Sequence, residues 1–89
     1  MTDRKKFRSY NDFKDYLDNN NILLDDLKSE WQLYNDYGLS KRQVRKYLKP
    51  MFYLREYNQN EMQMVTTRFY HLDDVESAID EIRFDKNML

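Results

Sequence analysis

The sequence predicts a small α+β domain with the element order helix, helix, helix, strand, strand, helix. Apolar residues recur at steps of three and four, the period of a helix with one buried face, in three segments: 10–18, 23 or 24 to about 36, and 72 to about 84. A shorter segment, 40–50, carries helix start and stop signals. Segments 51–57 and 62–70 are rich in aromatic and β-branched residues, which favour strands.

Length and composition restrict the class of protein. Eighty-nine residues form one domain, 1–89, with a single modest core. The chain has no cysteine, so disulfides and thiolate zinc sites are excluded and a reducing cytoplasm is expected. No apolar run approaches the roughly 20 residues of a membrane span, and the N-terminus lacks a signal-peptide pattern. We therefore expect a cytoplasmic protein that makes no contact with a membrane.

Positive charge is concentrated in one part of the chain. The net charge of -1 argues against a generic nucleic-acid coat protein. However, residues 41–60 carry six basic side chains and one acidic one, whereas residues 61–89 carry three basic and seven acidic ones. A polarised distribution of this kind can steer a charged partner toward one surface.

The first two helices are predicted from capping and periodicity. Ser9 precedes the helix 10–18, and residues 1–8 are expected to be a flexible basic N-terminus. Three asparagines at 19–21 predict a loop. The second helix places one apolar stripe toward the core: Leu24, Leu27, Trp31 and Tyr34. Trp31 is interpreted as a core residue, the alternative being an exposed platform on which a base stacks.

A helix-turn-helix is predicted around Ser40. Gly38 suits a left-handed residue that ends the preceding helix. Ser40 and Gln43 have capping-box spacing, and Leu39 and Val44 have the spacing of a hydrophobic staple. Two helices joined by so short a turn are typical of DNA-binding helix-turn-helix units.

The third helix has a basic face and an apolar face. At about 100° per residue, one arc of roughly 140° collects five cations: Lys41, Arg42, Arg45, Lys46 and Lys49. Val44, Tyr47 and Leu48 gather on another side, and Pro50 ends the helix. This pattern predicts a recognition helix that packs with one face and meets phosphate with the other. The alternative is an ordinary surface helix with a solvated basic face.

The two predicted strands are joined by four polar residues, 58–61, which indicates a hairpin. Such a hairpin is marginal alone and must pack on the helices, so it is expected to form a wing. The last helix closes the core with one stripe of apolar residues: Leu72, Val75, Ile79 and Ile82. The predicted fold is thus a winged helix-turn-helix with a two-stranded wing.

Over residues 24–83, this order and these residues resemble the winged helix-turn-helix of the MerR and phage excisionase superfamily. Residues 39–47 look like the family's turn and Arg-x-Tyr recognition helix. Residues 68–75 are similar to its wing exit, an Arg-x-Tyr followed by an acidic helix start. The chain departs from the family in having about 20 further residues before the matching region and no long dimerisation helix after it. It looks closer to a small phage or plasmid accessory protein than to a ligand-sensing regulator.

The resemblance implies that Arg45 and Tyr47 face the DNA and that Arg68 contacts a phosphate from the wing. Arginine and lysine can read guanine in the major groove, whereas glutamine can read adenine. If Gln43 is held in its capping box, it reads no base. The predicted set of double-stranded DNA contacts is Ser40, Lys41, Arg42, Gln43, Arg45, Lys46, Tyr47, Lys49, Arg55 and Arg68.

Catalysis is not expected. The chain has one histidine, His71, no cysteine and no glycine-rich phosphate loop. His71 is interpreted as a capping or surface residue, and neither a metal nor a cofactor is predicted. The rival hypothesis is a protein-binding module, such as a phage-encoded inhibitor built on a winged-helix frame, that uses the acidic region 61–89 or the tyrosine-rich surface. A monomer or weak dimer is expected, because no long C-terminal helix supplies a dimerisation device.

Overall fold

A computed structural model of the protein describes residues 5–87. It confirms a small α+β fold. Within these residues the fold has four α-helices and a four-stranded mixed sheet, where only a two-stranded wing was predicted. The elements are β1 Lys5–Phe7, α1 Tyr10–Asn19, the 3₁₀ turn η1 Leu24–Asp26, β2 Leu27–Ser29, α2 Glu30–Asn35, α3 Lys41–Tyr47, β3 Phe52–Asn58, β4 Gln63–His71 and α4 Leu72–Asn87. The predicted element order is wrong, because two short strands, β1 and β2, were not expected.

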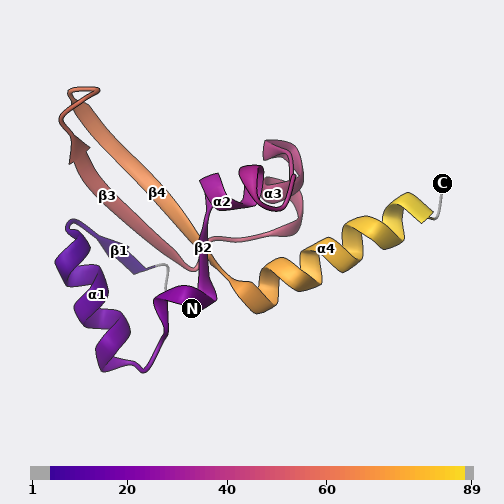
Figure 1. Ribbon diagram of the computed structural model, residues 1–89, viewed down its shortest axis with the longest axis horizontal. Helices are drawn as coiled ribbons and strands as arrows, with labels where there is room; N and C mark the ends of the chain where they lie inside the picture. Colours follow the sequence, from indigo (N-terminus) through magenta and orange to yellow (C-terminus); the bar gives the residue numbers. More distant parts are fainter. Residues whose placement is uncertain (1–4, 88–89) are drawn as a thin grey trace.

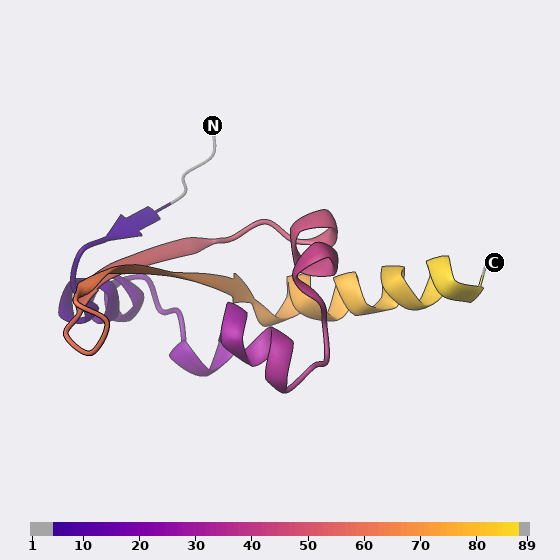
Figure 2. The same ribbon diagram turned by 90° about the horizontal axis from the view of Figure 1, so that it is seen from above.

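The hairpin of β3 and β4 is the centre of the sheet, whose strand order is β1-β3-β4-β2 (Figure 1). Its two strands pair antiparallel from Phe52–Phe69 to Asn58–Gln63, so the predicted hairpin is confirmed with both strands displaced by about one residue. β2 pairs antiparallel with the end of β4, and β1 pairs parallel with the start of β3. The hairpin and α4 extend in opposite directions from the region of α2 and α3 (Figure 2).

The expectation of a flexible segment 1–8 is wrong for residues 5–7, whereas residues 1–4 lie outside the described residues. Residues 5–7 form β1, in register with Phe52 to Leu54. Phe7 explains the pairing, because its ring lies 5.2 Å from that of Phe13 and 6.0 Å from that of Phe52, measured between centroids. Burying this aromatic side chain offsets the entropy of ordering the segment.

The continuous second helix predicted up to residue 36 is also wrong. Leu27 is extended and pairs with His71, and α2 begins only at Glu30. The cause is a second capping box: the Gln32 backbone N–H donates to Ser29 Oγ at 3.3 Å, and the Ser29 N–H donates to Gln32 Oε1 at 2.9 Å. Because Ser29 takes the N-cap position in β conformation, the helix cannot pass through it.

Trp31 is not a core residue, since its side chain is 70% exposed. The predicted stripe assumed a single helix whose phase ran unbroken from Leu24 to Tyr34. In the shorter α2 it is Leu33 that is fully buried. Trp31 precedes Leu33 by two residues, or about 200° around the helix axis, and therefore points away from the core.

The core is divided between the two faces of the sheet. Phe69 and Tyr70 are neighbours in β4, so their side chains point to opposite faces. On one face, α1 and the sheet enclose Phe13, Leu17, Leu27, Phe52 and Leu54, with Phe69 packed against them. On the other face, α2, α3 and α4 enclose Leu33, Val44, Leu48, Tyr70, Val75 and Ala78.

The helix-turn-helix signals are confirmed in their local geometry. Gly38 has a φ of +66°, and Ser40 and Gln43 form a complete capping box. Leu39 packs against the cluster that contains Val44, as the staple requires. However, α3 ends at Tyr47, since Leu48 is already extended, with φ -131° and ψ 149°. Lys49 therefore lies beyond the helix, where the following proline disfavours helical geometry.

The remaining helices agree with prediction more closely. The Ser9 side chain caps α1 by accepting from the Asp12 N–H at 3.1 Å. α4 begins at Leu72 as expected and continues to Asn87, three residues past the predicted end. Within residues 5–87, none of the helices has the length and apolar character needed to cross a membrane.

Candidate nucleic-acid interface

The exposed side of α3 carries a row of cations, which we call the helix patch. Its members are all exposed: Lys41, Arg42, Arg45, Lys46 and the adjoining Lys49. Val44, on the other side of α3, is fully buried against Leu33 and the first turns of α4. The helix is thereby fixed by its apolar side and presents its charged side to solvent.

Ser40 and Gln43 are committed to the N-terminus of α3. The Ser40 N–H donates to Gln43 Oε1 at 2.9 Å, and the Gln43 N–H donates to Ser40 Oγ at 3.1 Å. These bonds satisfy two backbone donors of the first turn. Gln43 Oε1 is therefore occupied, and Ser40 and Gln43 orient the helix patch.

Tyr47 ties the end of α3 to α4. Its hydroxyl donates to Asp85 Oδ2, and its half-buried ring packs against the core cluster below α3. The hydrogen bond to Asp85 raises the pKa of Tyr47 above its ordinary value. Lys46 lies over the Tyr47 ring, with Nζ 5.2 Å from the centroid. Tyr47 therefore supports the helix patch from below.

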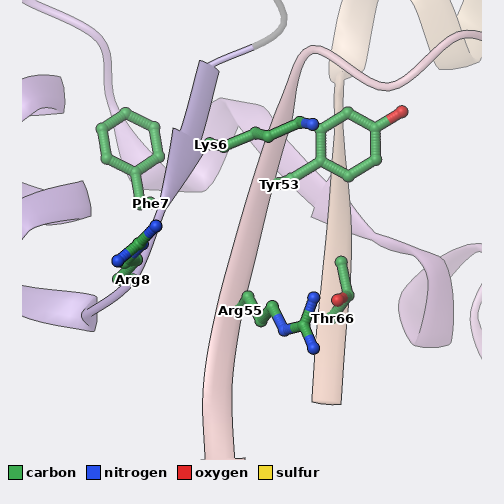
Figure 3. A pocket seen from close by; sticks show the side chains of 6 residues that line it. All are labelled: Lys6, Phe7, Arg8, Tyr53, Arg55 and Thr66. Atoms are coloured by element: carbon green, nitrogen blue, oxygen red, sulfur yellow. The ribbon is translucent and has the colours of Figure 1, made fainter. Parts of the chain in front are cut away.

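A second basic surface lies on the face of the sheet opposite α1. Lys6, Tyr53 and Arg68 are aligned across β1, β3 and β4, and Arg55 is paired with Thr66. In β3, Tyr53 and Arg55 alternate with the buried Phe52 and Leu54, so they point to the face opposite α1. Their partners in β1 and β4 point to the same face. Figure 3 shows Lys6 extending across β3 toward the Tyr53 ring and the Arg55 guanidinium beside Thr66.

This face borders a shallow hollow of about 550 Å³. We call its polar members the sheet patch: Lys6, Arg8, Tyr53, Arg55 and Thr66. The sixth lining residue is Phe7. Among the described residues, no carboxylate lines this hollow, so it attracts anions.

Two smaller hollows, of about 360 and 230 Å³, connect the patches. Both are lined by Glu30, Arg45 and Arg68. The larger also reaches Lys49 and Tyr53, and the smaller reaches Lys41, Trp31 and Thr66. Since Tyr53 and Thr66 also line the sheet-patch hollow, the helix patch and the sheet patch border adjoining hollows, which together we call the groove.

Arg68 is held by an acidic partner inside this groove. Its Nη1 donates to Glu30 Oε1 at 3.0 Å, while the Tyr34 hydroxyl donates to Glu30 Oε2 at 3.1 Å. The bond to Glu30 raises the pKa of Arg68, and burial, followed by Glu30, raises the pKa of Tyr34. The Arg68 guanidinium also lies 5.8 Å from the Tyr53 ring centroid. Its positive charge is therefore already balanced, unlike the charges of the helix patch.

The last helix, α4, is rich in acidic side chains. Its exposed carboxylates are Asp73, Asp74, Glu76, Asp80, Glu81 and Asp85. His71 Nδ1 accepts from the Asp73 N–H at 3.1 Å, which confirms the predicted capping role at the start of this helix. Within residues 5–87, no cluster of side chains is suited to holding a metal ion.

Sequence reasoning did not identify Lys6, Arg8, Tyr53 or Thr66 as site residues. Lys6 and Arg8 belong to a basic N-terminal segment whose pairing with β3 depends on tertiary contacts. The signal for Tyr53 was the alternation in β3, which places it on the same face as Arg55.

No protein-family model, curated protein or solved structure matches this chain. The class of protein is therefore defined by its own architecture: a small α+β protein with a capped basic helix beside an open, basic sheet face. The relationship to the MerR and phage excisionase superfamily remains a hypothesis, which rests on the sequence motifs alone.

Proposed function

We propose that this protein binds double-stranded DNA sequence-specifically, as a small transcriptional regulator or an excisionase-like recombination accessory factor. In this proposal α2 and α3 act as the helix-turn-helix and the β3–β4 hairpin as the wing. The observation that carries the proposal is the helix patch, in which five exposed cations lie on or beside one short helix fixed to the core by Val44. Such a helix fits the major groove, where cations meet phosphates and guanine edges.

The surrounding geometry supports this mode of binding. Arg42, Arg45 and Lys46 are exposed and are assigned to base edges or phosphates. Arg55 extends the positive surface along the wing. A contact from the wing to a phosphate would carry no direct sequence information. In this proposal the bases are therefore read by members of the helix patch.

Selection of bound fragments from a random duplex pool tests the sequence specificity of the proposal. We expect a short consensus of a few base pairs per protein copy, the span that a single recognition helix can read. Binding to all duplexes alike would reject sequence-specific recognition and leave only electrostatic attraction.

Arg68 supplies a more detailed test. Glu30→Gln keeps an acceptor oxygen but removes the charge that balances Arg68, so the guanidinium becomes free to attract a phosphate. We expect duplex affinity at low salt to increase about three- to tenfold, measured by fluorescence anisotropy. Asp15→Asn removes the same charge from α1, on the opposite face of the sheet, and serves as the control. Unchanged or weaker binding by Glu30→Gln would remove Arg68 from the proposed interface.

A protein-binding module is the second candidate function. The observation that favours it is the exposure of large apolar side chains on two helices, with Trp31 of α2 70% exposed and Phe84 of the acidic α4 63% exposed. Binding of duplex DNA separates the candidates, because a module that uses these helices has no need of the helix patch.

We further propose a monomer or weak dimer in free solution. A stable dimer in light scattering at low micromolar concentration would contradict that proposal.

A further inference from the structure

We propose that the sheet patch, together with Tyr57, binds a single-stranded DNA segment. The inference rests on the proposed nucleic-acid role, but it uses a surface different from the helix patch. Bases would stack on the tyrosines, and the backbone phosphates would lie against the cations around them.

The tyrosines have the placement that stacking requires. Tyr53 and Tyr57 are four residues apart in β3, so they stand on the same face of the sheet about 13 Å apart along the strand. Tyr57 lies opposite Met64 and is 55% exposed. The Tyr57 end of this face is open, because α1 packs on the other face of the sheet and α2, α3 and α4 pack at the Tyr70 end.

The charges around the tyrosines favour a polyanion. Lys6, Arg8 and Arg55 all line the hollow beside Tyr53. Of the neighbouring carboxylates, Glu56 points to the other face, where it accepts from the Tyr10 N–H at 2.9 Å, and Glu30 is paired with Arg68. A cationic groove with aromatic platforms is the usual solution for single strands.

The same features argue against duplex DNA as the occupant of this face. In a duplex the base faces are covered by their neighbours, so Tyr57 and the half-buried Tyr53 would gain no stacking contact. An unpaired strand exposes those faces, and stacking on them tolerates any base sequence. Because Arg45, Lys49 and Tyr53 line one hollow, an unpaired strand on the sheet patch would continue from a duplex held at the helix patch.

Fluorescence anisotropy with two labelled probes tests the inference. The probes are an oligothymidylate of about 12 nucleotides and a duplex of roughly 20 base pairs, both at about 50 mM salt. Tyr57→Ala is expected to weaken oligothymidylate binding about 5- to 100-fold and to change duplex binding less than about twofold. Tyr57→Phe retains the ring and should bind both probes normally.

Tyr10→Ala is the matched control, because Tyr10 is also exposed but lies at the start of α1, on the opposite face. Lys6→Glu is a second variant that weakens the single-strand site through charge, and circular dichroism checks that each variant is folded. The proposal is overturned if the wild-type protein fails to bind oligothymidylate, or if folded Tyr57→Ala binds it normally. Loss of duplex binding alone, with single-strand binding retained, would reject the proposed function of the helix patch and support the sheet patch.

Discussion

Reversing two charges of the helix patch, Arg45→Glu together with Lys46→Glu, is expected to lower duplex affinity at least about 100-fold at low salt. Both side chains are exposed, and each substitution replaces an attraction to phosphate by a repulsion. Neither residue contributes a buried contact, so the thermal midpoint should change by only a few degrees. Anisotropy titrations and thermal melts on the same samples measure both quantities.

The control for this double variant reverses two exposed cations elsewhere. Lys14→Glu in α1 with Arg83→Glu in α4 produces the same change in net charge away from the helix patch. We expect its duplex affinity to decrease much less. Equal losses in the two double variants would mean that overall charge controls binding, and the assigned face of α3 would be wrong.

Leu48→Ala, unlike the double variant of the helix patch, is expected to change stability. It should lower the free energy of unfolding by about 2 to 5 kcal/mol. Leu48 is only 7% exposed and packs in the cluster that contains Val44, Tyr70 and Val75. Removing its terminal atoms leaves a cavity between α3, the sheet and α4. A loss of this size is a large part of the stability of a domain of this length.

Denaturant titration measures the effect of Leu48→Ala, and Leu23→Ala, at a leucine that is 66% exposed, is the control. At low temperature, where the variant remains folded, its duplex affinity should approach that of the wild-type protein. If Leu48→Ala leaves stability unchanged, the packing face of α3 has been assigned wrongly.

Elements with complete local signals were predictable from the sequence. The helices α1 and α3 have side-chain caps at Ser9 and Ser40, and the hairpin has two β-rich segments around a polar turn. β1 and β2 are only three residues long, and their conformation depends on pairing with β3 and β4. Such pairing between distant segments leaves little local pattern.

The second capping box shows where local reasoning was incomplete. Ser29 and Gln32 have the same spacing as Ser40 and Gln43, yet the apolar periodicity across them favoured one long helix. The misplacement of Trp31 followed from that choice, since a restarted helix has a new phase.

The candidate site was predictable in part. Exposure of four helix-patch cations on α3 followed from helical periodicity alone. Arg68 and Glu30 are 38 positions apart in the sequence, so no local pattern predicted their contact. The sheet patch likewise required knowledge that β1 lies beside β3.

The salt dependence of duplex binding is the most direct test of the central claim that the helix patch meets DNA phosphates. If four or five of its cations do so, a plot of log K against log salt has a slope of roughly -4. The variant with Arg45→Glu and Lys46→Glu should then have a slope of roughly -2, because two contacts are lost. Absence of duplex binding by the wild-type protein at low salt, or the same slope in both proteins, would contradict the claim.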